Sequence, residues 1–187
     1  MGGTKSSSLL YWASGSGSIV LNNHIREGTI NIEEIDVKDL IITESQGWSH
    51  PSPLEIIITS KIEKIESLKL SRKLLLNKIN TGENYFEIAA RARVFRKFLK
   101  YAALEDIAQV KDKIKTDEDF LDTLTFVLGQ KATKIGNLDA ANFKKIVEFL
   151  EMASENLVIR KDANYCKEKI KEAIETHNLK KEKAINM

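Results

Sequence analysis

The side chains best suited to chemistry are few and scattered in this sequence. Histidines occur at His24, His50 and His177, and the single cysteine is Cys166. Neither an HExxH pair nor a second thiol accompanies them, so their spacing does not match a zinc site. Cys166 also falls on a helical apolar stripe with Ile170, where a small buried hydrophobe is the expected role. We therefore predict no catalytic residues, no metal and no cofactor, and a protein that is not an enzyme.

The most specific short motif lies at the start of the chain. Residues 1–6 read MGGTKS, which matches M-G-x-x-x-[ST], the pattern for myristoylation of Gly2 once Met1 is removed. A chance match is the alternative. A single myristoyl chain binds membranes only marginally, with an association constant on the order of 10⁴ M⁻¹. We expect weak membrane contact if Gly2 is acylated, strengthened by avidity in a multimeric shell.

A modifiable Gly2 on a flexible arm before a compact domain is similar to the arrangement in several viral matrix and minor capsid proteins. Only Gly2 and Ser6 carry this resemblance. It implies a virion component and brings no further site residue with it.

A second candidate site is a cluster of cations. If the chain is helical there, four basic residues share one face, without a neighbouring acid before Glu105: Arg93, Arg96, Lys97 and Lys100. Such a ridge could bind phosphates or an acidic partner. The alternative is a solvated face whose alkyl stems cover apolar neighbours.

Two tryptophans, Trp12 and Trp48, stand in weakly patterned segments. Aromatic residues in such segments serve as anchors in a partner's pocket or as plugs for the protein's own core. Both interpretations stay open from the sequence.

The elements that would position these residues are mainly helical. Residues 1–18 predict a flexible arm, residues 19–50 a segment of short β-strands, especially over 19–43, and residues 51–187 a helical domain. Ser52, Pro53 and Glu55 predict a capped helix start. About five helices are expected, packed as a bundle or irregular array, with no internal repeat at a fixed period: 52–79, 83–115, 117–128, one from Asn137 or Asp139, and one from Asp162.

Composition limits the class of function. The chain has 187 residues and a formal net charge of +2, which does not by itself indicate a nucleic-acid or membrane protein. A lone cysteine, no signal-like start and no long apolar run predict a protein of the cytoplasm or of a virion, neither secreted nor membrane-spanning. We predict a structural or assembly protein, plausibly of a viral or phage particle, whose arm contacts other subunits of a homo- or hetero-oligomer. The alternative is a helical protein that binds nucleic-acid phosphates.

Overall fold

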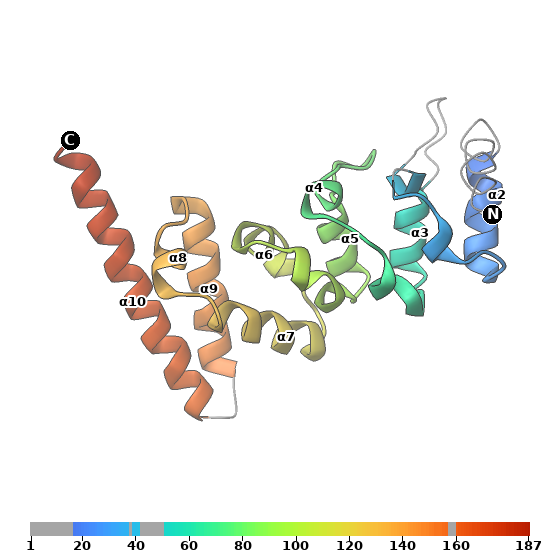
Figure 1. The fold of residues 1–187 in the computed structure, drawn as a ribbon. Coiled ribbons are helices and arrows are strands. Elements are labelled where there is room, and N and C mark those ends of the chain that lie inside the picture. The colour runs from blue at the N-terminus through green and yellow to red at the C-terminus, as the bar shows by residue number, and fades with distance from the viewer. Residues whose placement is uncertain (1–16, 38, 42–50, 157–159) are drawn as a thin grey trace. The chain divides into compact units, whose positions relative to one another are not determined.

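The computed structural model describes residues 17–37, 39–41, 51–156 and 160–187 (Figure 1). Helical elements dominate these residues, and they contain no β-strand, so the prediction of a mainly helical chain is confirmed. Two compact units are present, Met1–Tyr101 and Ala102–Met187. The predicted division into residues 1–18, 19–50 and 51–187 stays a prediction.

The first unit is a row of short helices. In this unit α2 packs on α3, and α3 packs on both η2 and α5, as Figure 1 shows for the three α-helices. The elements are α2 (Gly17–Glu27), η1 (Ile32–Glu34), η2 (Asp39–Ile41), α3 (Pro53–Thr59), η3 (Glu63–Ser67), α4 (Arg72–Leu75), α5 (Tyr85–Arg91) and η4 (Phe95–Tyr101), where η denotes a 3₁₀-helix.

The described residues of the predicted strand segment form α2, η1 and η2, joined by turns and irregular backbone. Ile32 and Ile35 are both buried and lie three residues apart, a spacing that one 3₁₀ turn places on a single side. Asn31 caps that turn by accepting a hydrogen bond from the Glu33 N–H. Buried Asn22 donates to the Pro51 carbonyl at 2.9 Å, so α2 is tied to the start of α3. The rest of the predicted arm and strand segment, residues 1–16, 38 and 42–50, lies outside the described residues.

The two long helices predicted over 52–79 and 83–115 are each divided into short elements. Lys61 and Arg93 adopt positive φ values of 52° and 64°, and a left-handed residue ends an α-helix. The predicted start at Ser52 is confirmed: its side chain caps α3 by accepting from the Glu55 N–H at 3.2 Å, and Pro53 follows in the first turn. Apolar spacing alone did not reveal these breaks.

The helix ends share one hydrogen-bond pattern. After α3, Ile62 N–H donates to the Ile57 carbonyl across left-handed Lys61, and after α5, Val94 N–H donates to the Ala89 carbonyl across left-handed Arg93. This six-residue closure is the Schellman motif. The same closure follows α2, where Thr29 N–H donates to the His24 carbonyl across Gly28, whose φ is 70°.

These positions reveal an internal repeat, which corrects the prediction that none exists. The left-handed residues Gly28, Lys61 and Arg93 stand 33 and then 32 residues apart. Helix caps recur at a similar interval: Ser52 and Asn84 in this unit, and Thr116 in the second unit, each accept a hydrogen bond from the backbone N–H three residues later. The first unit is therefore built from related helix-and-turn repeats, a design in which each repeat packs on its neighbours.

The second unit contains the longer helices. Its core is mainly apolar side chains of α6, α7, α9 and α10, and the ring of Phe120 lies 5.2 Å from that of Phe149. The cap predicted at Thr116 is confirmed, and of the two predicted caps for the fourth helix Asp139 is the one used. Its elements are α6 (Leu104–Val110), η5 (Lys111–Lys113), α7 (Asp117–Leu128), α8 (Ala132–Gly136), α9 (Ala140–Asn156) and α10 (Arg160–Ile185).

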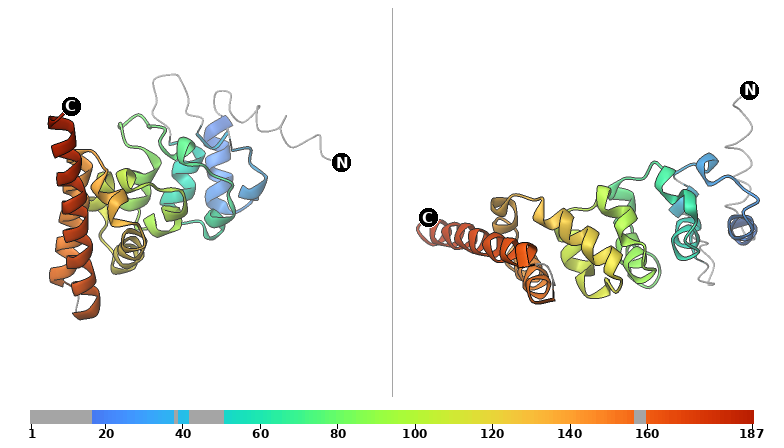
Figure 2. Two further views of the ribbon diagram at one scale, coloured as in Figure 1. Left: turned by 60° about the vertical axis from the view of Figure 1, so that its left-hand side comes forward. Right: turned by 90° about the horizontal axis from the view of Figure 1, so that it is seen from below.

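Helix α10 packs along α8 and α9, as both views of Figure 2 show. The contact with α8 depends on Gly136, where an added Cβ would lie 2.6 Å from the Thr176 Cβ and 2.7 Å from the Ala173 carbonyl oxygen. Beside it, His177 Nδ1 lies 3.0 Å from the Gly136 carbonyl oxygen, and its ring stacks on Phe143 with centroids 4.0 Å apart. The close approach of the α8 backbone at Gly136 and the stacked rings of Phe143 and His177 thus hold α10 against α8 and α9.

Candidate functional site

A surface hollow lies between equivalent segments of the first two repeats. Ile35 ends η1 and Leu68 ends η3, each with extended backbone and each donating its N–H to the carbonyl three residues earlier. The two residues are 33 positions apart, and each is 5% exposed. Because the repeats have similar backbones, these two side chains line one hollow of about 530 Å³ from opposite sides.

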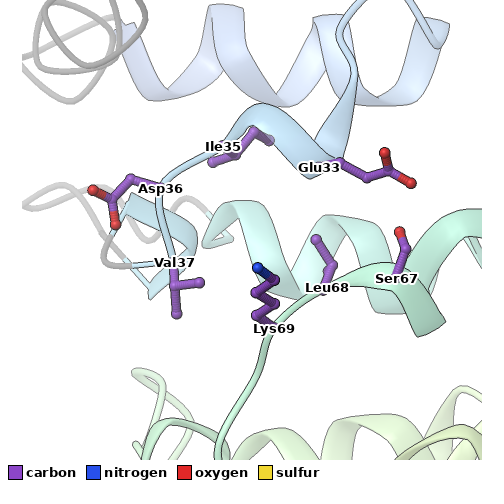
Figure 3. A pocket seen from close by; sticks show the side chains of 7 residues that line it. All are labelled: Glu33, Ile35, Asp36, Val37, Ser67, Leu68 and Lys69. Atoms are coloured by element: carbon purple, nitrogen blue, oxygen red, sulfur yellow. The ribbon is translucent and has the colours of Figure 1, made fainter. Parts of the chain in front are cut away.

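The rim of this hollow carries charges of both signs (Figure 3). Exposed Glu33 and Asp36 come from the first segment, and exposed Ser67 and Lys69 come from the second. In Figure 3 the Lys69 side chain extends from its own segment toward the opposite one. An apolar floor with a charged rim suits a protein segment that places an apolar side chain inward and polar groups outward.

The next repeat fixes one wall of the hollow. Lys100 donates from Nζ to the Glu66 carbonyl at 3.2 Å, and the Tyr101 hydroxyl donates to the Leu68 carbonyl at 3.0 Å. Both acceptors lie at the end of η3, where carbonyl groups lack partners inside their own helix. The Lys100 ammonium also lies 5.0 Å from the centre of the Tyr101 ring. Element η4 thereby holds the segment that supplies Leu68.

These contacts change the interpretation of the predicted cationic ridge. Arg93 is the left-handed residue between α5 and η4, while the other three residues lie on η4. Arg96 and Lys97 are half-buried, Arg96 makes an interaction of its own, and Lys100 contacts η3 as described. The four cations therefore do not share one face of a continuous α-helix, which was the basis for predicting phosphate binding.

A buried hydrogen bond connects two successive repeats. The hydroxyl groups of Ser52 and Tyr85 lie 2.6 Å apart, and both residues are at most 1% exposed. Burial raises the pKa of Tyr85, although the hydrogen bond with Ser52 opposes the rise. Nearby, burial raises the pKa of Glu55, and the positive charge of Arg91 only partly offsets it. Ser52 thus both caps α3 and bonds to the first residue of α5.

Other predicted site residues fall in different places. Gly2, Trp12 and Trp48 lie outside the described residues, so the lipidation site and the two anchors stay predictions. Cys166 is fully buried on α10, as its place on the apolar stripe predicted, and burial raises the pKa of its thiol. His177 is bound in the contact between α8 and α10.

The residues around the hollow were not found from the sequence. The signal that could have found them is weak: Ser-Pro-Leu-Glu-Ile at 52–56 aligns with Asn-Tyr-Phe-Glu-Ile at 84–88, with only Glu and Ile identical. The corresponding part of the first repeat, 32 residues before Glu55 and Ile56, has neither of these two residues. Backbone conformation, rather than residue identity, reveals the equivalence of Ile35 and Leu68.

Comparisons with protein-family models, with curated proteins and with solved structures found no match. Among the described residues, no three His, Cys, Asp or Glu side chains are grouped as they would be around a metal ion. None of the described helices combines the length and apolar character needed to cross a membrane.

Proposed function

We propose that this chain is a non-enzymatic structural or assembly protein that binds other protein subunits through the surface of its helical repeats. The observation that supports this proposal is the recurring helix end at Gly28, Lys61 and Arg93. Tandem helical repeats place equivalent segments next to one another and thereby form extended surfaces for partners. The hollow between Ile35 and Leu68 is a part of this surface that has room for a partner's side chain.

Three features make the hollow suitable for a protein partner. Its floor is apolar, its rim offers carboxylates and an ammonium group, and its second wall is held by Lys100 and Tyr101. A preorganised wall lowers the entropic cost of binding, since fewer groups must be ordered. Placement in a virion depends on Gly2 and stays a prediction from the sequence.

Site-specific photo-cross-linking in the cells that make the protein tests this proposal. A photoreactive side chain at exposed Ser67 should give protein adducts, and one at exposed Lys73, on α4, serves as the matched control position. Adducts at Ser67 should disappear when the rim charges are reversed by Glu33→Lys with Lys69→Glu. Adducts that are equal at the two positions, or unchanged by the reversal, would contradict a binding role for the hollow.

A further inference from the structure

The second unit has an exposed apolar hollow of its own. It measures about 370 Å³ and lies between the end of α7 and the start of α10. Leu121 and Tyr165 at its edge are 49% and 46% exposed, and they adjoin further leucines of the lining rather than standing singly. Its lining is Leu121, Leu124, Thr125, Leu128, Gly129 and Tyr165, with one carboxylate from Asp162.

Carboxylates gather along this leucine hollow, while Lys169 places one ammonium group 5.3 Å from the centre of the Tyr165 ring. Helix α7 reads DEDFLDTLTFVL and contains four carboxylates and no basic residue. Asp117 and Asp122 are exposed there, and Asp162 adds a third carboxylate from α10. A partner for this surface should therefore present apolar and basic side chains together.

Helix α10 carries a surface of that composition. Residues that follow one another at three- and four-residue intervals lie along one side of an α-helix. One such series on α10 is exposed at every position and contains no acid: Lys167, Lys171, Ile174, Asn178, Lys181 and Ile185. Ile174 is 39% exposed and Ile185 is 82% exposed. We name this series the lysine–isoleucine face.

The two surfaces cannot meet within one molecule. Tyr165 of the hollow and Ile174 of the lysine–isoleucine face both belong to α10, nine residues apart. At 3.6 residues per turn, nine residues correspond to two and a half turns, so the two side chains point to opposite sides of the same helix. A continuous helix does not fold back on itself, and the complementary surface must come from another chain.

We propose that the lysine–isoleucine face of one copy packs into the leucine hollow of a second copy. Ile174 then enters the hollow, and Lys171 and Lys181 approach the carboxylates of Asp122 and Asp162. Because the contact joins two different surfaces, a pair of copies keeps one free leucine hollow and one free lysine–isoleucine face for further neighbours. Such heterologous association produces a ring or an open filament. This inference rests on the proposed assembly role and names the partner as a second copy of the chain.

Sedimentation velocity of the purified full chain at low salt, over increasing concentration, tests this contact. We expect species heavier than the 21.2-kDa monomer that diminish as salt is added. Lys171→Glu with Lys181→Glu should abolish them, and so should Asp122→Lys with Asp162→Lys. A mixture of the two double variants should associate again, because each basic surface then meets an acidic one.

The matched control is Lys64→Glu with Lys183→Glu, which makes the same charge change elsewhere. Lys183 follows Ile174 by nine residues, or two and a half turns, and so lies on the opposite side of α10. This control should associate as the unmodified chain does. Circular dichroism confirms that each variant is folded. A purified chain that stays monomeric at every concentration, double variants that still associate, or a mixture that does not recover would each overturn the self-contact. A heavier complex in native cell extract alongside a monomeric purified chain would reject this inference and leave the proposed assembly role standing.

Discussion

Replacing the left-handed residues Lys61 and Arg93 by glycine should stabilise the first unit. Holding a residue with a Cβ in the left-handed region costs roughly 1–2 kcal/mol of folding free energy. Glycine avoids that cost but loses more backbone entropy on folding, which costs roughly 0.5–1 kcal/mol. The net gain for Lys61→Gly or Arg93→Gly is therefore about 0.5–1 kcal/mol each. Both side chains are exposed, so little packing is lost. The free energy of unfolding from urea titrations measures the gain.

Alanine at the same two positions is the matched control, because it removes the long side chain and keeps the Cβ. Lys61→Ala and Arg93→Ala should change stability little. The copy of the motif after α2 supplies the reverse test. Gly28→Ala should destabilise the first unit by about 1 kcal/mol, even though an added Cβ there meets nothing within 4 Å. If glycine is no more stabilising than alanine at Lys61 and Arg93, these residues do not have positive φ in solution, and the repeat is refuted.

Three further variants test the packing of the units. Gly136→Ala should destabilise the second unit by about 2–3 kcal/mol, since α10 must move away, whereas Gly129→Ala, with its nearest contacts at 3.4 Å, should be nearly neutral in the same thermal melts. Tyr85→Phe should cost about 1–2 kcal/mol in urea titrations by removing a buried hydrogen bond; an unchanged midpoint would contradict this. Glu55→Gln should stabilise the protein at pH 7, because burial raises the pKa of Glu55. As the pH falls through the raised pKa toward 4.5, Glu55 becomes protonated and the wild type regains this stability, so the variant's advantage over the wild type should vanish in acid. A stability advantage of Glu55→Gln that does not depend on pH would show another cause.

Local signals in the sequence predicted the helix starts well. Side chains at Ser52, Thr116 and Asp139 cap helices as expected because a cap depends only on its own residue and the next three. Gly129 ends α7 as predicted. These interactions are short-ranged, so residue type is sufficient to identify them.

The helix ends inside the first unit were not predictable in the same way. Lys61 and Arg93 have no special propensity for the left-handed conformation, and a glycine stands at the corresponding place only after α2. Tertiary packing selects that conformation, and it also selects the 3₁₀ turn Ile32–Glu34 in a segment whose isoleucines favoured strands. The repeat and its hollow depend on these choices, so they became visible only in three dimensions.

The proposal that this chain works by binding other protein subunits is tested most directly by its mass in a gentle extract of the cells that make it. Sedimentation of the untagged chain, detected by antibody, compares its mass with the 21.2 kDa of the monomer. The proposed function predicts a complex heavier than the monomer, either of several copies or of this chain with other proteins. A chain that sediments as a 21.2-kDa monomer in that extract would contradict it.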